Sequence, residues 1–205
     1  MDEINKLNEF QADALKEVGN IGMGHATTSL SKMLDKKIDI SLNSIRFVPL
    51  IYVPELVRNE ENVVGVIQQL KGNINGYLLL MLPKDSAKFL SKMMLDDPVD
   101  ANTFDEMEQS LLKELTNIMS GTYISAISNF LGITIMLSPP SQIYDMAEAI
   151  INQLVGMMIS DADNVLFLRT EFNVHTEKLY GKILIFTDSS SLSKILDAIN
   201  RIAAQ

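Results

Sequence analysis

The chain has 205 residues, a formal net charge of −9 and a pI of about 4.7, and 47% of its residues are hydrophobic. This balance predicts a folded globular protein, and the acidic surface argues against nucleic-acid binding, which needs clustered Lys and Arg. The absence of cysteine excludes disulfides, zinc–thiolate sites and thiol catalysis. No apolar stretch is long enough for a membrane span and the N-terminus lacks a secretory signal pattern, so we expect a cytoplasmic protein without membrane insertion.

The first half of the chain combines one long helix, three strands and one short helix. Apolar residues recur at three- and four-residue steps from Ile4 to about Leu34, which is helical periodicity, and alternating β-rich segments follow. The predicted elements are, in order, a helix over 4–34, a strand over 36–48, a turn or helical bridge over 50–57, two strands within 62–83 and an amphipathic helix over 84–95.

The second half repeats this order after the polar segment 96–102, which is the best candidate for a linker. Thr103 and Glu106 have the spacing of a capping box at the start of a second long helix. The remaining predicted elements are a strand over 132–140 that two prolines end, a helix from Tyr144 to about Ile159, two strands within 164–187 and a closing helix over 190–203.

A shift of 97 positions superimposes the two halves at their polar residues. It aligns Glu17 with Glu114, and the same shift carries Asn20 to Asn117. We therefore predict a single domain made of the pseudo-repeats 1–97 and 98–205. Its fold is α/β (α+β): an internally duplicated unit with one mostly antiparallel sheet and two long pseudo-symmetric helices.

Each long helix carries the same polar stripe, because positions i, i+4, i+7 and i+11 lie along one face. These positions hold Asp13, Glu17, Asn20 and Gly24 on the first helix and Ser110, Glu114, Asn117 and Gly121 on the second. A polar stripe is usually a solvated face, but a glycine inside a helix costs about 1 kcal/mol relative to alanine and brings a solvated face no gain. The glycine one turn beyond each asparagine instead clears space beside the amide, so we interpret both stripes as functional sites.

The residue types in the stripe favour positioning rather than acid–base chemistry. An asparagine amide offers a donor and an acceptor and barely titrates, so it can hold a water molecule in line for attack. A glutamate three residues earlier can pair with a cation on a partner. The two histidines, His25 and His175, are far apart in the sequence and form no ligand cluster, so no metal of the protein's own is expected.

The doubled stripe, the "NIGMGHA" continuation and the "SPPSQIYDM" segment resemble the CheC/CheX/FliY family of chemotaxis phosphatases over essentially the whole chain. The resemblance implies the duplicated α/β fold and hydrolysis of the phospho-aspartate of the response regulator CheY. It implies that Asn20 and Asn117 orient the attacking water and that Glu17 and Glu114 pair with the regulator's active-site lysine. Mg²⁺ is then bound by the regulator, and two intact stripes point to the CheC branch.

In the CheC branch, the helix after the paired prolines is similar to the docking surface for CheD, a receptor deamidase. The resemblance assigns that role here to Tyr144, Asp145 and Met146 at the start of the predicted helix. The alternative to a phosphatase is a non-catalytic binding module, either a CheD adaptor or a flagellar switch-like component. An internal pseudo-dimer reduces the need for a real one, so we expect a monomer.

Overall fold

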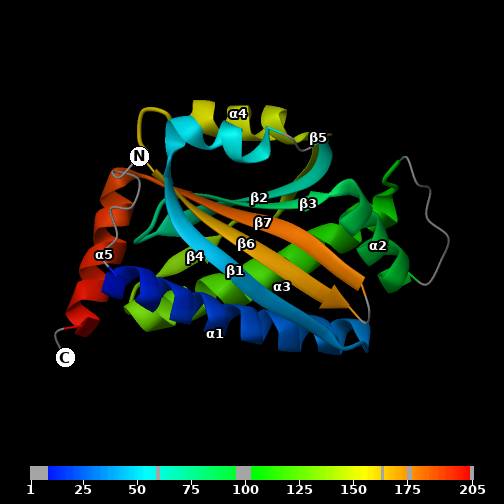
Figure 1. Ribbon diagram of the computed structural model, residues 1–205, viewed down its shortest axis with the longest axis horizontal. Helices are drawn as coiled ribbons and strands as arrows, with labels where there is room; N and C mark the ends of the chain where they lie inside the picture. Colours follow the sequence, from blue (N-terminus) through cyan, green and yellow to red (C-terminus); the bar gives the residue numbers. More distant parts are fainter. Residues whose placement is uncertain (1–8, 59–60, 96–102, 163, 175–176, 204–205) are drawn as a thin grey trace.

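The computed structural model describes residues 9–58, 61–95, 103–162, 164–174 and 177–203 (Figure 1). The predicted linker 96–102 and His175 lie outside these residues. The helices are α1 (Glu9–Leu34), α2 (Lys84–Leu95), α3 (Glu106–Leu131), α4 (Ala147–Met158) and α5 (Ser189–Ala203), with two short 3₁₀ helices, η1 (Leu50–Tyr52) and η2 (Pro54–Val57). The strands are β1 (Ile38–Pro49), β2 (Asn62–Gly72), β3 (Gly76–Pro83), β4 (Ile135–Leu137), β5 (Ser141–Met146), β6 (Asn164–Val174) and β7 (Glu177–Thr187).

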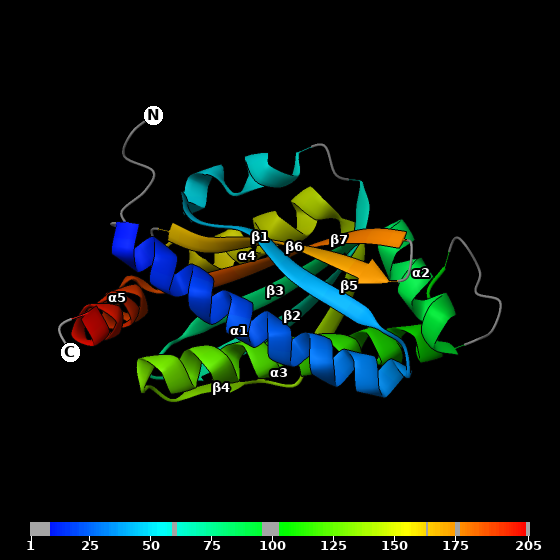
Figure 2. The ribbon, with the colours of Figure 1, turned by 60° about the horizontal axis from the view of Figure 1, so that its bottom comes forward.

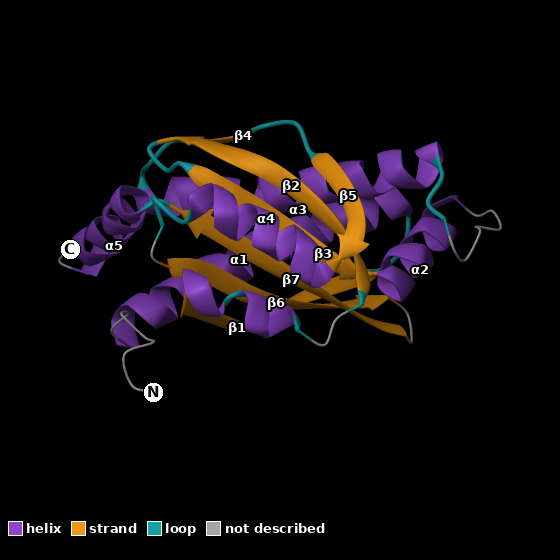
Figure 3. Ribbon diagram, turned by 90° about the horizontal axis from the view of Figure 1, so that it is seen from above, coloured by secondary structure: helices purple, strands orange, loops and turns teal. Residues whose placement is uncertain are grey.

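The strands form one seven-stranded antiparallel sheet in the order β1-β6-β7-β3-β2-β4, with β5 also paired to β2. Helices α1 and α3 lie under one face, whereas α4 and the 3₁₀ helices lie on the other (Figures 1 and 3). Alternate side chains of β2 and β3 enter separate cores: Val64 and Leu80 face α1 and α3, and Val63 and Leu79 face α4. The predicted mostly antiparallel sheet with two long helices is confirmed.

The strand order has a symmetry that bears on the predicted duplication. Exchanging β1 with β4 and β5, β2 with β6, and β3 with β7 returns the same order read backwards. The 3₁₀ helices and α4 take equivalent places, because Leu50 starts the first and Ala147, 97 positions later, starts the second. Duplication into the pseudo-repeats 1–97 and 98–205 stays a prediction, and this topology supports it.

The two long helices run antiparallel and side by side beneath the sheet (Figure 2). Gly22 lets them approach closely, because a Cβ added there would lie 3.0 Å from the Cα atom of Tyr123. Tyr123 is 1% exposed at this crossing, and burial raises the pKa of its phenol, which keeps it neutral. The helix crossing therefore fixes how α1 and α3 present their outer faces.

The N-terminus of α3 is capped by different residues from those predicted. Asp105 is the N-cap: its carboxylate accepts the Glu108 backbone N–H at 2.7 Å, and the Glu108 side chain accepts the Asp105 N–H at 3.1 Å. The prediction of a Thr103 and Glu106 box was therefore wrong by two residues. Lys88 of α2 explains the difference, since its ammonium lies 2.8 Å from the buried Glu108 carboxylate and draws that residue, rather than Glu106, into the cap.

The helix predicted from Tyr144 begins three residues later, at Ala147. Tyr144 pairs with Val64 of β2, and Asp145 pairs with Val63. The strand β2 offers backbone hydrogen bonds along this edge of the sheet, and these outweigh the helical pattern of the sequence. The three residues assigned to a docking helix thus lie on the strand β5.

Candidate functional site

Both polar stripes lie on the outer faces of α1 and α3, away from the sheet. Asp13, Glu17, Asn20 and Gly24 are all exposed on α1; Ser110, Glu114 and Asn117 are exposed on α3, and Gly121 is half-buried. The opposite sides of the same helices are buried in the core, through residues such as Val18 and Leu115. The two glutamate–asparagine pairs are therefore exposed to solvent. The helices that carry them, α1 and α3, are adjacent (Figure 2).

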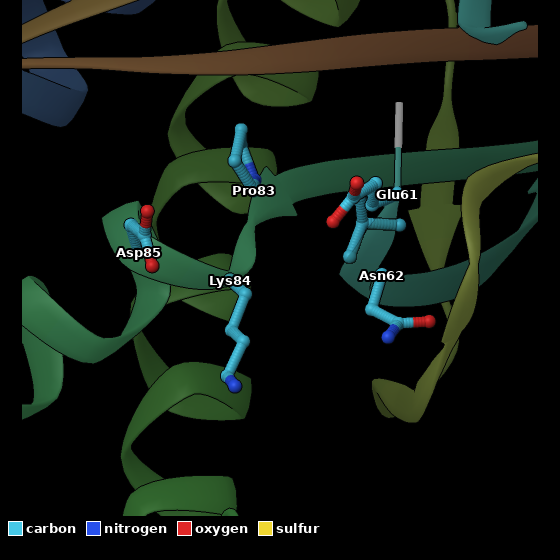
Figure 4. Close-up of a pocket in the computed structure, with 6 residues that line it drawn as sticks. Glu61, Asn62, Pro83, Lys84 and Asp85 are labelled. Carbon is cyan, nitrogen blue, oxygen red and sulfur yellow. The ribbon is translucent and has the colours of Figure 1, made fainter. Parts of the chain in front are cut away.

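The two hollows that the structure describes are lined by residues outside the stripes. One hollow of about 290 Å³ is lined by residues from the start of β2 and the β3–α2 junction, among them Glu61 and Lys84 (Figure 4). A second hollow, also about 290 Å³, lies on the sheet face opposite α1 and α3 and includes Arg46, Arg169 and Lys182. The stripes are thus exposed helix surface and are not part of either hollow.

The stripe glycines, Gly24 and Gly121, have open surroundings, whereas Gly22 at the helix crossing is closely packed. A Cβ added at Gly24 or Gly121 meets nothing within 4 Å. We expect Gly24→Ala to raise the free energy of unfolding by up to about 1 kcal/mol, because alanine favours a helix interior. Gly22→Ala should lower it by about 1 to 3 kcal/mol, because the new methyl overpacks the helix crossing. Urea denaturation of the two variants checks the pair, and shifts of the same sign would contradict it.

The second asparagine has a buried partner that sequence reasoning missed. Gln68 of β2 is 0% exposed, and its Nε2 donates to the Asn117 Oδ1 atom at 3.3 Å. The alternation of β2 carried the signal, since Gln68 shares its inward parity with Val64, Val66 and Leu70. A polar residue at an inward position needs a hydrogen-bond partner, and here one partner is the site asparagine.

The surroundings of the first asparagine, Asn20, differ from those of Asn117. Within the described residues, no hydrogen bond to the Asn20 side chain is found, and the nearest stripe positions are likewise exposed. Gly19, which has no counterpart in the second stripe, packs against Leu42, where an added Cβ would lie 2.6 Å from Cδ2. Gly19 and Gly22 are thus packing residues, whereas Gly24 and Gly121 border open space.

The segment predicted to bind CheD lies on another element than the stripes. Tyr144, Asp145 and Met146 are exposed on β5, on the outer side of β2, and Met146 is 56% exposed. The Tyr144 ring also packs edge-on against Phe104, with centroids 5.1 Å apart, next to the N-terminus of α3. Met157 of α4 and Ile159, the residue just after α4, are further exposed apolar side chains.

Over the ranges that the structure describes, no three His, Asp or Glu side chains lie close enough together to hold a metal ion. Among these same residues, no helix has the length and apolar character that crossing a membrane requires.

Two family models match the sequence, and together they span well over half of the chain. The model for "Chemotaxis phosphatase CheX" matches residues 64–160, which include Glu114 and Asn117, and the model for the "CheC-like family" matches residues 10–41, which include Glu17 and Asn20. These matches confirm the predicted resemblance to the CheC/CheX/FliY family of chemotaxis phosphatases. The chain is similar to the CheY-P phosphatase CheC of Bacillus subtilis, with 26% identity over 97% of this chain and 98% of that protein.

Solved structures show the same fold. The FliY structure from Thermotoga maritima superimposes with a TM-score of 0.80 at 24% identity, covering 96% of this chain and 98% of that one. A complex of CheX with CheY, BeF₃ and Mg²⁺ from Borrelia burgdorferi gives a TM-score of 0.51 at 20% identity, covering 82% of this chain and 96% of that one. These likenesses confirm the predicted CheC-like fold.

Proposed function

We propose that the chain is a chemotaxis phosphatase that hydrolyses the phospho-aspartate of the response regulator CheY. The observation that carries the proposal is the pair of exposed glutamate–asparagine stripes on α1 and α3, in a chain similar to a CheY-P phosphatase over 97% of its length. Exposed sites on helix surfaces fit a protein substrate, since the regulator brings its own phosphorylated pocket to the stripes.

In the proposed mechanism, Asn20 and Asn117 each place a water molecule in line with the phosphorus–oxygen bond to be broken. An acyl phosphate is already prone to hydrolysis, so holding the water accounts for most of the acceleration. The amide needs no ionisation for this role, like the water-orienting glutamine of a GTPase. Glu17 and Glu114, one turn earlier, pair with the active-site lysine of the regulator and set the docking angle.

Mg²⁺ is assigned to the regulator rather than to this chain. The complex from Borrelia burgdorferi contains CheX, CheY, BeF₃ and Mg²⁺. It supports the proposal that Mg²⁺ is present when a phosphatase of this kind binds CheY. When bound in the regulator, Mg²⁺ neutralises charge on the phosphoryl oxygens. The stripes of this chain contribute carboxylates for the lysine and amides for the water.

The direct test follows the loss of phosphate from phosphorylated CheY with Mg²⁺ present. Adding the chain in catalytic amounts should speed this loss above the intrinsic rate of CheY, with multiple turnovers. A rate that stays at the intrinsic value would contradict a phosphatase and leave the non-catalytic module, an adaptor or flagellar switch-like component, as the better explanation.

A second partner, CheD, stays a prediction from the resemblance. The residues predicted to bind it are exposed on the edge strand β5. We expect Asp145→Lys to abolish capture of CheD in a pull-down, because it reverses an exposed charge on that edge while its backbone pairing with Val63 remains. Asp161→Lys, an exposed position just beyond α4, is the matched control and should leave capture unchanged. Undiminished capture by Asp145→Lys would remove β5 from the docking surface. A cytoplasmic monomer likewise stays a prediction.

A further inference from the structure

Gln68 is fully buried in the sheet, and both the nitrogen and the oxygen of its side-chain amide form hydrogen bonds. One Nε2 hydrogen goes to the backbone carbonyl of Ser138 at 3.0 Å, and the other goes to Asn117 Oδ1 at 3.3 Å. Its Oε1 accepts the hydroxyl of Ser120, one turn beyond Asn117 on α3. Both donors and one acceptor position are therefore occupied, as a buried amide requires.

The Ser138 carbonyl determines which way this amide points. A carbonyl can only accept, so it must face Nε2 of Gln68, and the second hydrogen on Nε2 then faces Asn117. The paired prolines 139 and 140 stop the strand here, between β4 and β5, because proline has no N–H for the ladder. Ser138 is held at this break by two bonds to Gln69, one from its own N–H to the Gln69 carbonyl and one from the Gln69 N–H to its hydroxyl, each 2.9 Å.

The Gln68 amide in turn fixes the Asn117 amide. Since Nε2 can only donate, Asn117 must turn Oδ1 inward, and this leaves Nδ2 and one lone pair of Oδ1 toward solvent. Those are the groups available to hold a water molecule. The asparagine of the second stripe is thus oriented before any partner arrives.

Among the residues that the structure describes, no equivalent hydrogen bond supports Asn20 of the first stripe. The β1–β6 and β5–β2 registers, which pair Phe47 with Leu166 and Tyr144 with Val64, make Thr170 the counterpart of Gln68. Thr170 is 0% exposed and donates to the Gly181 carbonyl at 3.0 Å. The counterpart of Ser120 is the buried Met23. Neither Thr170 nor Met23 has a side-chain amide that could orient Asn20 in the way that Gln68 orients Asn117.

We propose that Gln68 is a positioning residue for Asn117 and that it makes the Glu114–Asn117 site the faster of the two. The inference rests on the proposed phosphatase function and adds an asymmetry to it. Asn20 is oriented only when the regulator and its water arrive, so ordering that side chain raises the barrier at the first site. Gln68 touches neither substrate nor water and acts through Asn117.

The test isolates each site by removing the asparagine of the other. In an Asn20→Ala background, we expect Gln68→Met to lower kcat for phosphorylated CheY about 10-fold with KM unchanged, since positioning is lost while docking through Glu114 remains. In an Asn117→Ala background, the same substitution should leave kcat and KM unchanged. Ser120→Ala keeps the Gln68 amide but removes one anchor, and it should lower kcat in the first background about 3-fold.

The outcomes separate positioning from general damage and from failure of the proposed function. An equal loss in both backgrounds, or no loss in the Asn20→Ala background, overturns the positioning role. Thr170→Val, the matched buried control, should leave the Asn20→Ala background unchanged. Full activity of the double Asn20→Ala/Asn117→Ala chain contradicts the phosphatase mechanism itself, whereas an inactive double variant with an ineffective Gln68→Met contradicts only the asymmetry.

Discussion

Replacing Asn20 and Asn117 together with alanine should lower the rate of phosphate loss from phosphorylated CheY about 100-fold toward its intrinsic value. The reason is that each asparagine holds the attacking water at one of two separate sites, and no other described side chain of either stripe presents an amide. A single substitution should leave the other site working. We expect Asn117→Ala to cost more than Asn20→Ala, because the lost amide is the one that Gln68 orients.

Stability measurements must accompany these rates. Asn20 is exposed, so Asn20→Ala should change the free energy of unfolding by less than about 0.5 kcal/mol. Asn117→Ala removes the acceptor of one buried N–H of Gln68, so it should lower the free energy of unfolding by about 1 to 3 kcal/mol. Asn129→Ala is a suitable control, since Asn129 is exposed on α3 beyond the stripe and should give the wild-type rate. A double variant that is folded and as fast as wild type would show that water is held by something other than these amides.

Much of this site was predictable from the sequence because it is local. The spacing of Glu114 and Asn117 places them on one helical face whatever the helix packs against, and the second copy at a shift of 97 made the spacing specific. The long helices and the two hairpins likewise follow from hydrophobic period. The resemblance to a known family then supplied the substrate, which no period or spacing encodes.

The features that sequence reasoning missed depend on contacts between distant segments. The N-cap of α3 lies two residues later than predicted. Lys88, twenty positions before Glu108, binds the Glu108 carboxylate that completes this cap. Helix α4 begins later than predicted because residues 141–146 pair with β2 as a strand. Gln68 was visible as a polar residue at an inward position, but its partner Asn117 is 49 positions away and only the fold brings them together.

The second large effect concerns the link between α2 and α3, and it acts on stability rather than on chemistry. The Lys88 ammonium lies 2.8 Å from the Glu108 carboxylate, which is 1% exposed, and 4.1 Å from the centroid of the Phe104 ring. Lys88→Met should lower the free energy of unfolding by about 3 kcal/mol, because it leaves the Glu108 carboxylate buried without its cation. Urea denaturation measures this as a lower midpoint with an unchanged slope.

Two further variants distinguish the ion pair from the loss of any lysine on α2. Lys92→Met changes an exposed lysine of the same helix and should shift the midpoint little, so equal shifts for the two lysines would contradict a special role for the pair. Adding Glu108→Leu to Lys88→Met should recover part of the loss, because an apolar pair leaves no unpaired charge in the core. The recovery should stay incomplete, since Glu108 also accepts the Asp105 N–H that starts α3, the helix that carries Glu114 and Asn117.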